Sequence, residues 1–148
     1  MKELRVVIDT NVIISGSFWK GISCKIIETI DGKYLIIVSS PILEEYKEII
    51  FSEDIMERTE HFKEPRENII SKLLQKSLIV TPKETIKVIE NDPDDNKFLE
   101  AAVAGNADYL ITKDEKHILP LKEFRGIKIV TPEEFLTIMN ERKDQQIV

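Results

Sequence analysis

The chain has 148 residues, of which 42% are hydrophobic and 32% are charged, and these values predict one globular domain rather than a disordered or fibrous chain. Its formal net charge of −6 at pH 7 argues against indiscriminate binding to polyanions, because nonspecific affinity for nucleic acid comes mainly from lysine and arginine. The single cysteine excludes an intrachain disulfide. One cysteine and two histidines offer too few sulfur and nitrogen ligands for a typical structural zinc site, so a bound metal is expected to have oxygen ligands.

The first predicted strand is "LRVVI" (residues 4–8), which ends abruptly at Asp9, Thr10 and Asn11 before apolar residues resume. The apolar run is far shorter than the roughly 18 residues that a membrane span needs, and it lacks the layout of a signal peptide. We therefore expect no membrane association and a cytoplasmic protein.

The rest of the chain alternates short β-branched runs with longer segments of helical periodicity. The further predicted strands are residues 34–38, 78–81, 108–112 and 127–131. The predicted helices between and after them are residues 40–51, 64–77, 94–106 and 131–142. This alternation predicts a single α/β domain over residues 1–148, with a mainly parallel sheet between helices and a loose tail from about residue 143.

Two carboxylates follow the ends of predicted strands. Asp9 ends the first strand, and Asp114 follows the fourth strand by two residues in "LITKD". Ligands of open parallel sheets collect beyond the carboxyl ends of the strands, so these side chains share one space if the two strands are neighbours. Like charges about 4 Å apart repel by roughly 4 kcal/mol at an effective dielectric of 20, which a divalent cation would offset. The alternative interpretation is that both residues are ordinary helix caps.

Two further acids come from predicted helices. On a helical wheel with steps of about 100°, Asp95 in "NDPDDNKFLEAA" falls near the centre of the buried face, whereas Asp94 lies to one side. Asp92, just ahead of Pro93, is assigned to the turn. In "SPILEEYKEII", Glu45 flanks the buried stripe and Glu44 points outward. Their alternative roles are a first-turn acid for Asp95 and a solvated surface residue for Glu45.

Taken together, these four acids are predicted to lie on one rim of the sheet. Oxygen donors of this kind suit Mg²⁺ or Mn²⁺, which can promote a phosphodiester displacement. Polar residues beside the acids would support the site: Thr10, Asn11, Asn96 and Thr112. Metal ions, rather than the net charge of the protein, would then receive a phosphate.

Three segments resemble, in order and spacing, the signatures of PIN-domain proteins, particularly the small prokaryotic toxin components of toxin–antitoxin systems: "VVIDTNVIISG", "SSPILEEY" and "NDPDDNKFLEAAVAGNADYLITKD". The resemblance implies a three-layer α/β/α sandwich with a five-stranded parallel sheet in the order 3-2-1-4-5. It also implies an Mg²⁺- or Mn²⁺-dependent ribonuclease that forms a homodimer and has an antitoxin as a partner.

Carried over to this sequence, the resemblance implies an acidic quartet of Asp9, Glu45, Asp95 and Asp114, supported by Thr112 and Asn11. The second acid stays open between Glu44 and Glu45, and the third between Asp92, Asp94 and Asp95.

The favoured hypothesis is a metal-dependent endoribonuclease that hydrolyses RNA. One alternative is a phosphatase with an aspartyl-phosphate on Asp9, which is disfavoured because Asn11 stands where such enzymes have a second aspartate. Another alternative is a non-catalytic module that binds nucleic acid or protein.

Several other residues have both a structural and a functional interpretation. His61 and His117 are interpreted as surface residues, Trp19 as a packing residue with base stacking as its alternative role, and Cys24 as a small core residue. The charged segment 52–67 is predicted to be a solvated helical hairpin, with a substrate-gripping lobe as the alternative. Four cations near the predicted rim are either solvated or hold a nucleic-acid backbone: Lys20, Lys113, Lys116 and Arg125.

Overall fold

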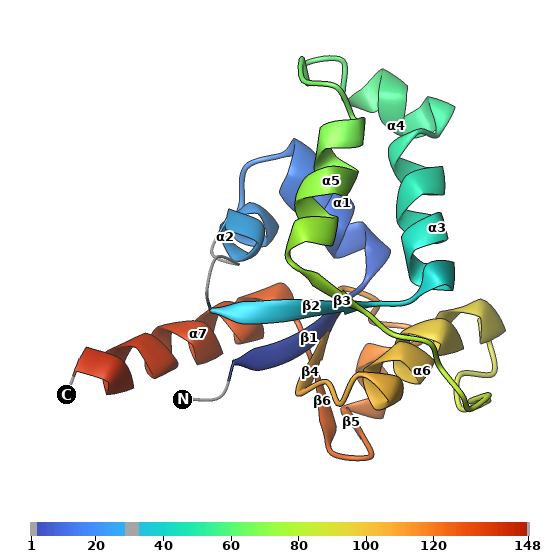
Figure 1. Cartoon of the computed structure of the whole chain (residues 1–148), viewed down its shortest axis with the longest axis vertical. Helices are drawn as coiled ribbons and strands as arrows, with labels where there is room; N and C mark the ends of the chain where they lie inside the picture. The colour runs from blue at the N-terminus through green and yellow to red at the C-terminus, as the bar shows by residue number, and fades with distance from the viewer. Residues whose placement is uncertain (1–2, 29–32, 148) are drawn as a thin grey trace.

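The computed structural model describes residues 3–28 and 33–147, and it describes side chains as far as Arg142. Within these ranges the chain forms a six-stranded sheet in the order β3-β2-β1-β4-β6-β5 (Figure 1). The strands are β1 (Leu4–Ile8), β2 (Tyr34–Val38), β3 (Ser77–Ile79), β4 (Tyr109–Ile111), β5 (Glu123–Phe124) and β6 (Ile127–Val130).

The five predicted strands are all present, and they pair in parallel in the expected order, with β6 as the fifth of them. The prediction of a five-stranded, all-parallel sheet is nevertheless wrong, because β5 adds an antiparallel sixth strand at the edge, beside β6. Arg125 and Gly126 connect these two strands, and both have positive φ angles, of 49° and 85°. Such a pair of angles forms a tight hairpin turn, and two-residue strands show no periodicity from which to predict them.

Helices cover the sheet. Figure 1 shows α1 to α5 on one side of the strands and α6 on the other. The α-helices are α1 (Thr10–Phe18), α2 (Ile22–Glu28), α3 (Ser40–Ile50), α4 (Glu53–Arg58), α5 (Glu67–Gln75), α6 (Asn96–Ala104) and α7 (Pro132–Ile147). Two short 3-10 helices, η1 (Pro93–Asp95) and η2 (Leu119–Leu121), lie in the connections. In residues 3–28 and 33–147, no helix is long and apolar enough to cross a membrane.

Three differences from the predicted helices concern the site or the chain end. The predicted helix over 94–106 is divided into η1 and α6, so its first turn is tighter than a regular α-helix. The backbone of residues 143–147 continues α7, whereas the sequence predicts a loose tail there. Within the charged segment 52–67, only α4 is helical before α5 begins at Glu67.

The core lies around the two central strands. In β1, Val6, Val7 and Ile8 are completely buried, because helices cover both faces of this strand. Tyr46 of α3 is also buried, and its hydroxyl donates a hydrogen bond to the carbonyl of Ile8. This contact ties α3, which also carries Glu45, to the carboxyl end of β1.

Candidate functional site

A cavity lies beyond the carboxyl ends of the neighbouring strands β1 and β4. Residues 6–8 of β1 pair in parallel with residues 109–111 of β4. The strand order reverses at this pair, because β2 and β3 lie on one side of β1, whereas β4, β6 and β5 lie on the other. The cavity has a volume of about 240 Å³. It is lined by Asp9, Thr10, Asn11, Glu45, Ile49, Asp92, Asp95 and Asp114. The structure therefore places all four predicted acids and Asn11 around one cavity.

Asp9 occupies the single position between β1 and α1. Its side chain accepts a hydrogen bond from the backbone N–H of Thr10 at Oδ1 and another from the hydroxyl of Thr112 at Oδ2, each at 2.7 Å. Only 7% of the residue is exposed. This burial raises the pKa of Asp9 to about 6, although the two hydrogen bonds oppose the rise. The residue is thus both a helix cap and a buried carboxylate of the cavity, so the two interpretations of the sequence are compatible.

Asp114 is held in a tight turn after β4. The buried hydroxyl of Thr112 accepts a hydrogen bond from the backbone N–H of Asp114 at 3.0 Å, while it donates to Asp9. Asp114 Oδ1 accepts from the backbone N–H groups of Lys116 and His117, both at 3.0 Å. Thr112 therefore links the carboxylates of the two strands, whereas it does not itself line the cavity.

Glu45 reaches the cavity from α3, whereas Glu44 is exposed. The hydroxyl of Thr10 donates a hydrogen bond to Glu45 Oε2, and Lys97 Nζ lies 2.6 Å from Glu45 Oε1. Lys97 also pairs with Asp94 Oδ2 at 2.7 Å, and its side chain is only 12% exposed. In the free protein, a lysine on α6 thus compensates the charge of Glu45.

Asp92 and Asp95 both line the cavity, whereas Asp94 points away from it and pairs with Lys97. Asp92, which the sequence assigns to the turn before Pro93, therefore faces the cavity as well. A 3-10 helix has about three residues per turn, so residues three apart lie on the same side. Burial raises the pKa of Asp95 to about 7, and the charges of the neighbouring acids, that of Asp92 first, add to this rise.

His117 is close to this pair, although its sequence context predicts a surface residue. One imidazole nitrogen of His117 and one oxygen from each of Asp92 and Asp95 lie within 4.8 Å of one another. Its Nδ1 atom also lies 3.3 Å from Asp114 Oδ2, and its side chain is 28% exposed. The spacing of three residues from Asp114 to His117 is the only sequence signal for this position.

Asn96 supports the site in a different way from the one predicted. Its amide is buried and bonds to the backbone N–H and carbonyl of Ile89, each at 2.9 Å, and to the carbonyl of Pro93 at 3.0 Å. With all of these bonds made inside the fold, Asn96 fixes the segment before η1 instead of facing the cavity.

The remaining candidate residues lie elsewhere. Trp19 packs edge-on against Phe18, with ring centroids 6.2 Å apart, and it lies beneath Arg58. Trp19, Lys20 and Lys113 line a separate cavity of about 280 Å³. Arg125 is paired with Glu84 at 2.6 Å and does not line the acidic cavity. Trp19 thus makes packing contacts but is 36% exposed, so its role in base stacking stays the alternative interpretation.

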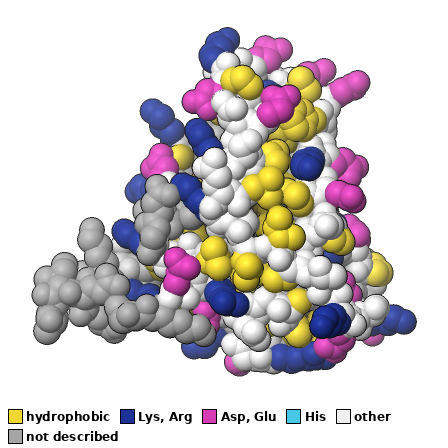
Figure 2. Space-filling model, viewed as in Figure 1, with side chains coloured by type: hydrophobic (Ala, Val, Ile, Leu, Met, Phe, Trp, Pro, Cys, Tyr) yellow, Lys and Arg dark blue, Asp and Glu magenta, His cyan; other side chains and the backbone are white. Residues whose placement is uncertain are grey.

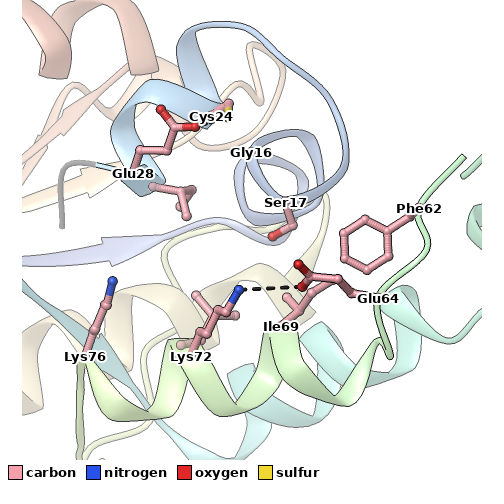
Figure 3. A pocket seen from close by; sticks show the side chains of 11 residues that line it. Gly16, Ser17, Cys24, Glu28, Phe62, Glu64, Ile69, Lys72 and Lys76 are labelled. Carbon is pink, nitrogen blue, oxygen red and sulfur yellow. Dashed lines mark hydrogen bonds and ion pairs between the residues drawn. The ribbon is translucent and has the colours of Figure 1, made fainter. Parts of the chain in front are cut away.

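Cys24 is only partly buried, so its interpretation as a core residue is wrong. Its thiol contacts Glu28 at 3.3 Å. Figure 3 shows both residues at a cavity of about 330 Å³ between α1, α2 and α5, where Lys72 and Glu64 are 3.6 Å apart. This cavity shares no lining residue with the acidic one.

The fold and site define a class of protein: a doubly wound α/β domain with a cluster of acids at the reversal of its strand order. A family model described as the PIN domain matches residues 5–116, more than half of the chain, and the chain therefore belongs to the PIN-domain family. This match includes the four predicted acids, and it confirms the family that the sequence motifs indicate.

A solved structure has the same fold. The crystal structure of PAE2754 from Pyrobaculum aerophilum matches with a TM-score of 0.53 over 93% of this chain and 90% of that chain. The two sequences are 11% identical, so this likeness concerns the fold alone. A search of curated proteins finds no match.

Proposed function

We propose that this protein is a metal-dependent endoribonuclease that hydrolyses phosphodiester bonds of RNA at the acidic cavity. The observation that carries the proposal is the meeting of Asp9, Glu45, Asp95 and Asp114 around one cavity in a PIN domain. PIN domains are generally metal-dependent nucleases. RNA is chosen as the substrate class because of the resemblance in sequence to prokaryotic PIN toxins.

The donor set of the cavity fits a divalent cation. All of its acidic side chains offer carboxylate oxygens, the ligands that Mg²⁺ and Mn²⁺ prefer. Burial, together with the charges of neighbouring acids, raises the pKa values of Asp9 and Asp95, so both carboxylates would gain from a nearby cation. The carboxylates of Asp92 and Asp95 accept no hydrogen bond from any residue that the structure describes, so their lone pairs are available to an ion.

Asp9, Asp95 and Asp114 would hold the cation, with Glu45 completing the site. When bound, divalent ions activate a water molecule and neutralise the charge that develops on the phosphate. Thr112 orients Asp9 and Asp114 through the two hydrogen bonds that it makes with them. Thr10 and Lys97 hold one oxygen each of Glu45.

The substrate-facing wall of the cavity has a different chemistry. Asn11 is exposed there and carries an amide that can donate to a phosphate oxygen. Lys97 is the cation nearest to Glu45, and its positive charge offsets the repulsion between the carboxylates and an entering phosphate.

The test is incubation of untagged protein with RNA and Mn²⁺, with and without EDTA. We expect the wild-type protein to cleave RNA and Asp9→Asn to be inactive. Asp54→Asn is the matched control, because Asp54 has a side chain that is 74% exposed on α4. Cleavage that persists in EDTA or in Asp9→Asn would refute the proposal, as would the absence of cleavage by the wild-type protein with bound Mn²⁺. The last outcome would favour a non-catalytic binding module.

We extend the proposal to a cytoplasmic toxin that has an antitoxin partner and forms a homodimer. The resemblance to prokaryotic PIN toxins supports the toxin role, and exposed apolar side chains support self-association. Figure 2 shows hydrophobic side chains in a stripe over α3 to α5. The exposed large hydrophobic residues of the described chain include Phe51, Met56 and Ile79. Light scattering measures the mass in solution, and growth arrest that depends on Asp9 measures toxicity.

A further inference from the structure

His117 adds a nitrogen donor to a cavity whose other potential ligands are oxygens. One of its imidazole nitrogens and one oxygen from each of Asp92 and Asp95 lie within 4.8 Å of one another. Bonds of about 2.1 Å to a common ion allow opposite ligands to be about 4.2 Å apart. Three side chains at this separation can therefore meet one ion after small movements.

The contact with Asp114 determines which nitrogen of His117 is available. Nδ1 lies 3.3 Å from Asp114 Oδ2. Because an ionised carboxylate only accepts hydrogen bonds, Nδ1 must be the donor, and the lone pair of a neutral imidazole then resides on Nε2. A carboxylate that orients a histidine in this way is the usual support of a metal-binding imidazole.

The two carboxylates near His117 are also available. Asp92 and Asp95 are three residues apart across η1, and both line the acidic cavity. Neither carboxylate caps a helix or accepts a hydrogen bond from the part of the chain that the structure describes. By contrast, Asp114 Oδ1 already accepts two backbone N–H groups.

We propose that the imidazole of His117 and the carboxylates of Asp92 and Asp95 form a mixed nitrogen and oxygen subsite that binds Mn²⁺ in preference to Mg²⁺. The inference rests on the proposed function in that the nuclease requires a divalent ion. Mg²⁺ favours oxygen ligands in strict octahedral geometry and loses its water reluctantly, whereas first-row transition ions accept imidazole. Asp95, which faces both this subsite and Asp9, joins it to the rest of the cavity.

The experiment measures the coordination of Mn²⁺ directly, without RNA. Untagged protein is loaded with Mn²⁺, and pulsed electron paramagnetic resonance records the modulation from a directly bound imidazole ¹⁴N. Mg²⁺ competition then gives the preference between the two ions. His117→Gln removes the nitrogen ligand, and His61→Gln is the matched control, because His61, the other histidine, contacts the carbonyl of Phe18 instead.

We expect ¹⁴N modulation in the wild-type protein and in His61→Gln but not in His117→Gln. The preference for Mn²⁺ over Mg²⁺ should fall by about tenfold or more in His117→Gln, because even the loss of an outer partner of a metal ligand typically costs about 10- to 100-fold in metal affinity. Asp92→Asn should weaken Mn²⁺ binding while it preserves the modulation. Asp54→Asn should leave both unchanged, because the side chain of Asp54 is 74% exposed on α4 and pairs with Arg58.

Modulation that is absent from the Mn²⁺-loaded wild-type protein, or that persists in His117→Gln, would overturn the inference. An unchanged preference between the ions in His117→Gln would overturn it as well. If the modulation depends on His117 but the protein cleaves no RNA, the subsite is supported and only the proposed function fails. If RNA is cleaved without any nitrogen ligand, the inference alone fails.

Discussion

Asp9→Asn should stabilise the metal-free protein at neutral pH, although the proposed activity depends on Asp9. The carboxylate is 7% exposed, and burial raises its pKa from 3.8 to about 6. Between these two values the folded protein binds more protons than the unfolded chain, so the free energy of unfolding falls as the pH rises. Above about pH 6 the full penalty of a buried charge is present.

The size of the effect follows from the pKa change and from the hydrogen bonds of Asp9. The change from 3.8 to about 6 corresponds to about 3 kcal/mol at neutral pH, at about 1.4 kcal/mol for each tenfold change in ionisation. Asparagine can still accept from the N–H of Thr10, but its NH₂ group would face the hydroxyl of Thr112. This mismatch costs about 1 kcal/mol, which leaves a net stabilisation of about 1–2 kcal/mol.

The assay is urea unfolding in EDTA at about pH 4.5 and about pH 7.5, on either side of the titration of Asp9. Asp9→Asn should be more stable than the wild-type protein at the higher pH and equal or less stable at the lower pH. Added Mn²⁺ should then stabilise the wild-type protein more than Asp9→Asn, because ligand binding to the folded state raises its stability and Asp9→Asn lacks one of the proposed ligands. An Asp9→Asn protein that loses stability equally at both pH values would refute the reasoning.

Two further substitutions test the contacts around the acids. Thr112→Val should lower the free energy of unfolding by about 1–3 kcal/mol in urea, since it removes a buried donor to Asp9 and the acceptor of a backbone N–H, whereas Thr112→Ser should lose much less. Lys97→Met should lower the melting temperature of the metal-free protein, because it leaves Glu45 without its cation. In thermal melts, added Mn²⁺ should raise the melting temperature of Lys97→Met by more than it raises that of the wild-type protein. Equal rises in the two proteins would contradict this expectation.

The parts of the fold that are predictable from sequence have a strong local pattern. Mainly apolar runs of five residues identify β1 and β2, and the serine cap and the proline in the first turn of α3 mark where that helix begins. By contrast, α1 is apolar around most of its circumference, and its buried residues include Val12, Ile13 and Ile14 in succession. A helix of this kind has no stripe with a period of 3.6 residues, so periodicity alone does not reveal it.

The candidate site is predictable where it depends on strand ends and regular helices. Asp9 and Asp114 are identifiable because an acid just after a buried strand of a parallel sheet lies at the edge where ligands bind, and Glu45 because α3 is regular. Asp92 stays one of three open choices in the sequence, and His117 escapes prediction, both for physical reasons. A 3-10 helix changes the angular spacing around Asp92, and a turn rather than a periodic element positions His117.

The acidic cavity combines two forms of charge compensation that have different consequences for metal binding. Asp9 and Asp95 have raised pKa values, so part of the excess negative charge of the free protein is removed by protons. Glu45 is instead neutralised by Lys97, which is also held by Asp94. A proton leaves a carboxylate when a divalent ion arrives, but a lysine tethered between two acids stays in place. Under the proposed function, an ion would therefore gain the most from Asp9 and Asp95, while Glu45, held at both oxygens, would complete the site by orienting water or substrate.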